Sequence, residues 1–266
     1  MKRLLLAVVA LVAVTISASS QPIDELKARA KRGDHAAQYY LAGCYYNGKG
    51  VAKDLSEAIK WWRKSAKAGY VYAQYDLGIC YQTGEGVTKD IAEAVKLMRK
   101  AAGQGYAQAQ FMMYLYYKDG VEGITKDLTE AVKWCRKAAE QGLADAQVAL
   151  SLSYNYGDGV TKDIVESLKW LRKAADQRYA FAQYLLAEYY YKGEGGVTKD
   201  VTEAVKWYRK AAEQGHPSAQ LVLGVCYHKG DGVAKDLTEA VKWYRKAAQQ
   251  GSDLAKKMLS VLGETL

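Results

Sequence analysis

The chain has 266 residues, of which 50% are hydrophobic and 25% charged, and its formal net charge at pH 7 is +9. This composition excludes an intrinsically disordered protein, which would hold fewer hydrophobic residues. Pro22 and Pro217 are its only prolines, and a low proline content is compatible with a largely helical fold.

The first twenty residues differ in composition from the rest. Lys2 and Arg3 precede an apolar run at 4–16 that is interrupted only by Thr15, and small residues follow at 17–20. This order is typical of a secretory signal peptide, and the run is short for a membrane span. We predict a signal peptide at 1–20, cleaved near Ser20, and a periplasmic or secreted protein that is not an integral membrane protein.

Six similar segments follow, spaced by 36 or 37 residues. A period of this length is typical of a solenoid, whose stacked units are each too small to bury a core alone. Shorter helical segments at 21–32 and 251–266 are expected to cap the two ends. The predicted repeats span 33–68, 69–104, 105–141, 142–177, 178–214 and 215–250.

Each repeat is predicted to hold two helices. In the last repeat the first helix is expected around 218–227, with Leu223 and Tyr227 on one face. The position after the leucine holds a small residue in five repeats, such as Gly224, so that a neighbouring helix can approach closely. Tyr114 takes this position in the third repeat, and we expect altered packing there.

A turn of the form G-x-G-V-x-K-D joins the two helices, with one extra residue in the third and fifth repeats. Its final aspartate is followed three residues later by glutamate, a spacing typical of a capping box at a helix start. General acid–base catalysis needs one tuned pair of acids, not six copies, so we interpret these acids as structural. The pairs are Asp54 and Glu57, Asp90 and Glu93, Asp127 and Glu130, Asp163 and Glu166, Asp200 and Glu203, and Asp236 and Glu239.

The core face of the second helix is expected to hold Ala131, Trp134, Cys135 and Ala138 in the third repeat. The other three cysteines, Cys44, Cys80 and Cys226, share one position in different repeats. Equivalent positions in stacked helices lie roughly 10 Å apart, which is too far for a disulfide. We therefore predict that all four cysteines are buried apolar residues.

Known catalytic motifs are missing from the sequence. S-x-x-K, G-x-S-x-G and H-E-x-x-H do not occur, and His35, His216 and His228 fall in different repeats without ligand spacing. The sequence therefore predicts neither an enzyme nor a cofactor or metal site.

The repeated string LG..Y..G.GV.KD...A..W..KAA..G, found over 33–250, resembles the Sel-1-like repeat family, relatives of tetratricopeptide repeats. The resemblance implies an all-α, right-handed α/α superhelix that serves as an adaptor or scaffold. Exported bacterial members are associated with envelope regulation, polysaccharide export and host interaction. A cysteine-rich branch is linked to penicillin binding and β-lactamase activity, but it carries two cysteines per repeat, and this chain does not.

The resemblance also implies that the first helices line a concave groove. Four positions of each first helix are then expected to point into it, and these positions vary between repeats. Varied aromatic residues suit recognition of an extended peptide or a partner helix; the alternative is that some pack between neighbouring helices. The predicted partner-binding residues are Tyr39, Tyr46, Tyr72, Tyr75, Phe111, Phe181, Tyr184, Tyr191 and His228.

Each second helix carries three cations, as in Lys133, Arg136 and Lys137. Stacked, the cations would form a ladder able to attract nucleic acid, anionic glycans or lipid headgroups. The alternative is a solvated surface with internal pairs such as Glu130 with Lys133 and Arg209 with Glu213. We favour the solvated surface, because export argues against a nucleic-acid partner.

These observations together predict an exported, non-enzymatic adaptor that binds a protein or extended peptide in its groove. The alternative is a cell-wall or glycan-binding protein, with or without weak β-lactamase-like hydrolase activity, because aromatic grooves also stack on sugars. Binding to purified peptidoglycan would separate the two hypotheses.

Overall fold

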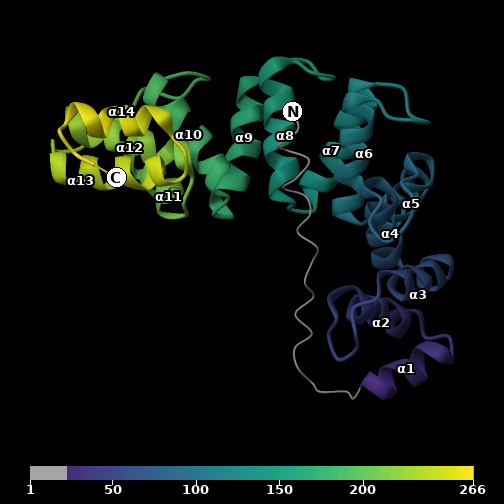
Figure 1. Ribbon diagram of the computed structural model, residues 1–266. Coiled ribbons are helices and arrows are strands. Elements are labelled where there is room, and N and C mark those ends of the chain that lie inside the picture. Colours follow the sequence, from purple (N-terminus) through teal and green to yellow (C-terminus); the bar gives the residue numbers. More distant parts are fainter. Residues whose placement is uncertain (1–22, 266) are drawn as a thin grey trace. The chain divides into compact units, whose positions relative to one another are not determined.

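The computed structural model describes residues 23–265, so the predicted leader and its cleavage position near Ser20 lie outside the described residues. The chain divides into two compact units between Lys126 and Asp127. Figure 1 shows that the described part of each unit is built from helices joined by short turns. The predicted all-α solenoid is confirmed.

The first unit holds six helices among its described residues and the second holds eight. An isolated bridge between Val121 and Ile124 is the only β-type pairing in the described part of the chain. No helix within residues 23–265 is long and apolar enough to cross a membrane. The helices of the first unit are α1 (Ile23–Lys31), α2 (His35–Asn47), α3 (Leu55–Lys67), α4 (Val71–Thr83), α5 (Ile91–Gly103) and α6 (Ala107–Asp119). Those of the second unit are α7 (Leu128–Glu140), α8 (Ala144–Tyr156), α9 (Ile164–Asp176), α10 (Ala180–Lys192), α11 (Val201–Glu213), α12 (Pro217–Lys229), α13 (Leu237–Gln249) and α14 (Asp253–Val261).

Within each unit, every helix packs against the helix that precedes or follows it along the chain. We call α2, α4, α6, α8, α10 and α12 the first helices, and α3, α5, α7, α9, α11 and α13 the second helices. The short end helices α1 and α14 pack against α2 and α13, and Ala30 and Leu259 join the cores there.

The predicted aspartate caps are present at all six second helices. At α7, for example, the Asp127 carboxylate accepts a hydrogen bond of 2.9 Å from the backbone N–H of Glu130. In a capping box the glutamate side chain also accepts a hydrogen bond from the backbone N–H of the aspartate. At α3 this second hydrogen bond does not form. The backbone N–H of Asp54 donates instead to the Tyr45 carbonyl, and the Glu57 carboxylate pairs with Lys60 at 2.6 Å. The cap therefore ties the second helix to the end of the first.

In five repeats a small residue follows the leucine of the first helix. Where this residue is Gly78 or Gly224, it lies against a second helix, as expected. A Cβ placed on Gly78 would come within 2.9 Å of the Met98 side chain, and one on Gly224 within 2.7 Å of the Tyr244 ring. In the third repeat, Tyr114 is buried and stacks on Phe111, with ring centroids 5.4 Å apart. The bulky residue is thus accommodated by a local aromatic contact that the other repeats lack.

The second glycine of the turn packs against the preceding repeat. A Cβ on Gly159 would lie 2.1 Å from the Leu128 carbonyl oxygen, and one on Gly232 would lie 2.5 Å from that of Val201. Both glycines have a positive φ, which side chains disfavour. The third repeat differs, because a Cβ on Gly123 would have nothing within 4 Å, whereas one on Gly195 of the fifth repeat would lie 2.5 Å from the Ile164 side chain.

Candidate functional site

Tyrosine side chains from α2, α4 and the turn before α6 gather in the first unit. Tyr72 lies between Tyr39 and Tyr106, with ring centroids 6.0 and 5.3 Å away, and Tyr106 also contacts Tyr75 at 5.2 Å. Such tilted and edge-on contacts are the favoured geometries for aromatic pairs. We call this group the tyrosine cluster; its members are Tyr39, Tyr40, Tyr70, Tyr72, Tyr75 and Tyr106.

The predicted groove residues differ in how much surface they offer to a partner. Tyr39, Tyr75 and Phe111 are buried, so that little of each side chain is exposed to a partner in this structure. Tyr72 and Phe181 are exposed by 44% and 39%, and they offer apolar area to a partner. The remaining four predicted residues are half-buried: Tyr46, Tyr184, Tyr191 and His228.

Asp76 lies among the buried tyrosines of the first unit. Its Oδ2 accepts a hydrogen bond of 2.9 Å from the Tyr39 hydroxyl. Burial raises the pKa of this carboxyl to about 6, and the hydrogen bond from Tyr39 opposes that rise only partly. The hydrogen bond from Tyr39 therefore offsets only part of the cost of desolvating the Asp76 carboxylate.

A second aromatic group lies in the second unit, around the start of α12 and the middle of α10. The His216 ring stacks on Tyr184 at 4.9 Å and on Phe181 at 5.9 Å. Tyr208 contacts both Tyr184 and Tyr191, at 5.9 and 6.4 Å. Three of the predicted residues, Phe181, Tyr184 and Tyr191, are therefore joined through two residues that the sequence interpretation missed.

Glu188 is the acidic residue of this second group. Its Oε1 accepts from the Tyr208 hydroxyl at 2.5 Å, and its Oε2 pairs with Lys192 Nζ at 3.1 Å. Both carboxylate oxygens are thus engaged within the chain.

Two of the predicted residues stand apart from these groups. The Tyr46 ring lies 5.3 Å from Trp62, and Lys53 Nζ lies 5.7 Å from the Tyr46 centroid. His228 contacts Tyr244 edge-on at 6.3 Å. The contact of His228 with Tyr244 thus lies within the sixth repeat, whereas Tyr46, whose pKa is raised by burial and by a hydrogen bond with Glu85, also faces Asp76 of the second repeat.

The missed residues carry sequence signals that can be found in retrospect. Tyr70, Tyr106 and His216 occupy the position directly after the turn glycine, which is also Tyr179 in the fifth repeat. Asp76 occupies a position that is apolar in the other repeats, namely Tyr40, Met112, Ala149, Leu185 and Val222. A comparison of repeats at every position, and not only at the expected groove positions, would have singled them out.

Charge is distributed unevenly between the two kinds of helix. Neither α2, α4 nor α8 contains lysine or arginine, and α6 contains only Lys118, whose Nζ lies 5.5 Å from the Tyr114 centroid. Every second helix carries a Lys, Arg, Lys set. The first helices therefore offer an aromatic face with very few cations.

Most cations of the basic ladder contact partners within the chain. In all six second helices the first lysine pairs with the glutamate three residues earlier, at 2.6 to 3.1 Å. The predicted pair of Glu130 with Lys133 is confirmed, whereas Arg209 donates to the Tyr227 hydroxyl at 2.6 Å and not to Glu213. In five second helices the last lysine lies over a tryptophan ring, as Lys210 does over Trp207 at 3.6 Å.

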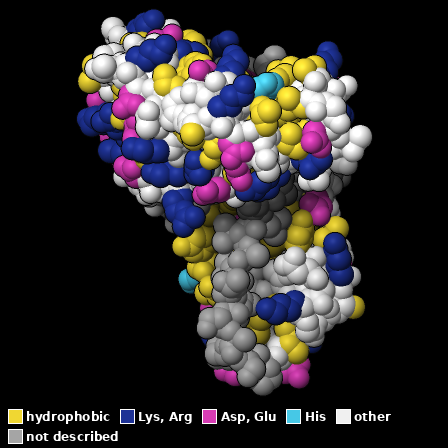
Figure 2. All heavy atoms as spheres, turned by 90° about the vertical axis from the view of Figure 1, so that its left-hand side faces the viewer, with side chains coloured by type: hydrophobic (Ala, Val, Ile, Leu, Met, Phe, Trp, Pro, Cys, Tyr) yellow, Lys and Arg dark blue, Asp and Glu magenta, His cyan; other side chains and the backbone are white. Residues whose placement is uncertain are grey.

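On the face drawn in Figure 2, lysine and arginine side chains lie interspersed with aspartate and glutamate side chains. Mixed charge of this kind is typical of a solvated surface and does not produce the single-sign field that steers polyanions.

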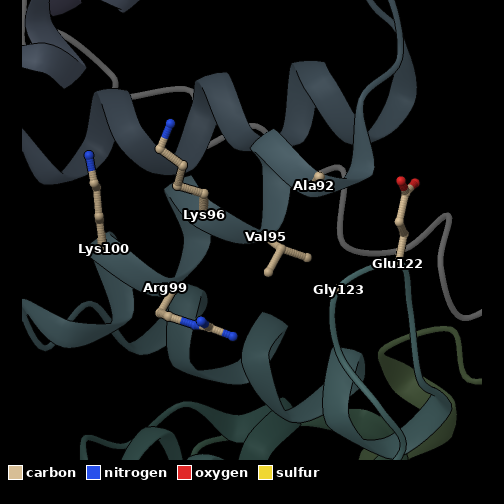
Figure 3. A pocket seen from close by; sticks show the side chains of 7 residues that line it. All are labelled: Ala92, Val95, Lys96, Arg99, Lys100, Glu122 and Gly123. Atoms are coloured by element: carbon tan, nitrogen blue, oxygen red, sulfur yellow. The ribbon is translucent and has the colours of Figure 1, made fainter.

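The second repeat is the exception, because Leu97 replaces the tryptophan and leaves Lys100 without an indole. An open cleft of about 380 Å³ lies here, between α5 and the third-repeat turn at Glu122 and Gly123. Figure 3 shows that Lys96 and Lys100 extend in one direction from α5 while Arg99 points in another. These cations do not converge on a point where one anion could bind.

The four cysteines are buried, as expected. Burial raises the pKa of the Cys80 thiol to about 12 and that of Cys226 to about 11, which disfavours the reactive thiolate. Cys135 Sγ donates to the Ala146 carbonyl at 3.2 Å. Across the described residues, no group of three or more histidine, cysteine, aspartate or glutamate side chains is placed to hold a metal ion.

Comparison with known proteins follows the repeat pattern. A family model described as Sel1 repeat matches residues 35–70, 71–106, 107–143, 144–179, 180–216 and 217–252. No curated protein matches the chain by sequence.

Several solved structures are similar to this chain. The protective antigen c5321 of uropathogenic Escherichia coli strains, which displays an SLR fold, is 38% identical with a TM-score of 0.85; the match covers 90% of this chain and 51% of that protein. The chain therefore spans about half the length of that relative. A Sel1 repeat protein from Oxalobacter formigenes is 34% identical with a TM-score of 0.76, and the match covers 86% of this chain and 99% of that one. The immunity protein PA5088 from Pseudomonas aeruginosa, at 21% identity and a TM-score of 0.52, shares the fold; this match covers 88% of this chain and 83% of that one.

Proposed function

This chain belongs to the Sel1 repeat family, and we propose that it is an exported, non-enzymatic adaptor that binds a protein or extended peptide on its first helices. Sel1 repeat proteins generally mediate protein–protein interactions, and their scaffold is generally non-enzymatic. The composition of the first 20 residues supports export. N-terminal sequencing of protein recovered from cell fractions tests the export proposal, and we expect a mature chain that starts after Ser20.

One observation supports the binding face above the others. Each unit exposes an aromatic ring from a first helix, Tyr72 in the first and Phe181 in the second, and other aromatic rings pack against both. Rings held in place lose little conformational entropy on binding, which is why aromatic residues are enriched among interface hot spots. Most cations of the second helices are instead engaged by partners within the chain, less completely in the second repeat, where Leu97 replaces the tryptophan.

The test is a crosslinking pull-down with residues 21–266, followed by binding measurements with the purified partner. The variant Tyr72→Ala with Phe181→Ala removes the two exposed rings that pack against other aromatic rings, and we expect at least about tenfold weaker binding, since a hot-spot truncation costs about 2 kcal/mol or more. Val165→Ala with Leu237→Ala is the matched control, because these apolar side chains are 73% and 45% exposed on second helices.

Equal binding by the Tyr72→Ala, Phe181→Ala variant and the wild type would contradict the proposed face. Binding to purified peptidoglycan, with no protein captured, would support the alternative of a glycan-binding protein, in which the exposed rings stack on sugars.

A further inference from the structure

Asp76 combines an unusual position with an unusual environment. It is the only charged residue at its position among the six repeats. It lies on α4, where no lysine or arginine occurs, and α2, which supplies its hydrogen-bond donor Tyr39, has none either. A carboxylate in an aromatic setting without a cation is costly to the fold, so its presence calls for a cause other than stability.

One of the two carboxylate oxygens of Asp76 is free to accept a hydrogen bond. Its Oδ2 accepts from Tyr39, whereas Oδ1 has no hydrogen-bond partner among the described residues and is not fully buried. The Asp76 side chain as a whole is half-buried. Oδ1 is therefore the carboxylate oxygen that is left to accept a hydrogen bond from another donor.

Five groups lie close enough to Asp76 for its charge to affect their pKa, and all five are neutral at physiological pH; the Glu85 carboxylate also acts on two of them, Tyr46 and Cys80. Burial raises the pKa of each, and the charge of Asp76 adds to that rise. They are Tyr39 and Tyr46 of α2, Tyr75 and Cys80 of α4, and Tyr106 before α6. A cation placed here would gain the carboxylate and the electron-rich faces of nearby rings together, and it would meet no competing positive charge from these groups.

Glu188 of the second unit provides an internal comparison. It has a tyrosine hydroxyl on one oxygen, as Asp76 does, but its other oxygen is taken by Lys192, four residues later on the same helix. The residue four positions after Asp76 is Cys80. The site around Asp76 thus lacks the intrachain cation that its counterpart in the second unit has.

We propose that the protein partner inserts a lysine or arginine side chain between the rings of the tyrosine cluster, where its cationic group pairs with Asp76. This inference rests on the proposed function and specifies the chemistry of the partner: a peptide segment with a basic anchor residue. The exposed Tyr72 ring, which contacts Tyr39 at 6.0 Å, would cover the aliphatic part of that side chain.

The test uses a random-peptide display library selected separately on wild-type residues 21–266 and on the variant Asp76→Asn. Asparagine keeps the size of the side chain and an acceptor for the Tyr39 hydroxyl but removes the charge. Asp24→Asn is the matched control, because the Asp24 side chain lies in the same unit and is 87% exposed. Circular dichroism and thermal melting verify the fold, and Asp76→Asn should melt no lower than wild type, since it removes a charge that burial disfavours.

We expect peptides selected on the wild type to be enriched in lysine or arginine. They should bind Asp76→Asn about tenfold more weakly or worse, and Asp24→Asn as well as wild type. Binding should also weaken between about pH 7.5 and about pH 5, because the free carboxyl takes up a proton as the pH falls through its raised pKa of about 6.

Selected peptides without basic enrichment, or with equal affinity for Asp76→Asn, would overturn this inference and leave the proposed function standing. Peptides that bind Asp76→Asn as well as wild type but bind Tyr72→Ala more weakly would also overturn this inference and support the proposed function. Failure to select any peptide, together with no partner in the pull-down, would contradict both proposals. Binding of free choline but of no peptide would overturn the assignment of a peptide partner.

Discussion

Single residues decide how closely the helices of a repeat approach. Gly224 of α12 faces the Tyr244 ring of α13, whereas Gly43 of α2 has nothing within 4 Å of an added Cβ. Both are glycines inside a helix, but only Gly224 directly follows the leucine, at the position where the sequence predicts close approach of a neighbouring helix. The difference comes from the neighbouring helix, which presents a ring at one position and open space at the other.

We expect Gly224→Ala to lower the free energy of unfolding by about 1–3 kcal/mol, because the new methyl group would lie 2.7 Å from the Tyr244 ring and force it to move. Gly43→Ala is the matched control and should raise the free energy of unfolding by about 0.5–1 kcal/mol through helix propensity alone. Urea unfolding followed by circular dichroism measures both. Equal effects of the two substitutions would show that the contact at Gly224 is not tight.

At the scale of elements, the six repeats share one way of ending a second helix. A glycine with positive φ follows that helix in five repeats, and Arg178 takes this position once, with φ of 65°. An arginine in this region is strained, because its Cβ crowds the backbone. The open cleft beside it, of about 390 Å³, includes Trp207 and Lys210.

Arg178→Gly should therefore raise the free energy of unfolding by about 1 kcal/mol, as it relieves the left-handed strain. The reverse exchange, Gly215→Arg at the equivalent position of the next repeat, should lower it by a similar amount. Thermal melting of the two variants measures the changes. A lower melting temperature for Arg178→Gly would indicate that the arginine side chain makes a stabilising contact that outweighs the strain.

At the scale of the whole molecule, each of the two units is a series of helices in which each packs against its neighbours in the chain. Within each unit the most extensive contacts join helices that follow one another in the chain. Stability in such arrays is a sum of repeat and neighbour terms, so damage to one repeat stays largely local.

Leu223→Ala tests this expectation, because Leu223 is fully buried in the core of the sixth repeat. The substitution should lower local stability by about 2–5 kcal/mol. In hydrogen-exchange mass spectrometry we expect faster exchange in α12 and α13 and little change in α2 and α3. Leu41→Ala, at the equivalent position of the first repeat, should give the opposite pattern. Uniformly faster exchange in both variants would show instead that the described chain unfolds as one cooperative body.

The sequence by itself determined the repeat, the two helices of each unit, the aspartate caps and the buried cysteines. These features depend on local chemistry, namely the apolar period, the capping residues and the turn glycines, and they recur in each copy. Only the tertiary structure decided which aromatic residues are available to a partner. Tyr39 and Tyr72 look alike in the sequence, but one is buried beneath its neighbours and the other is exposed. The environment of Asp76 was also decided by tertiary structure, because tyrosines from other helices contribute to it, and a single repeat does not reveal which side chains its neighbours bring to it.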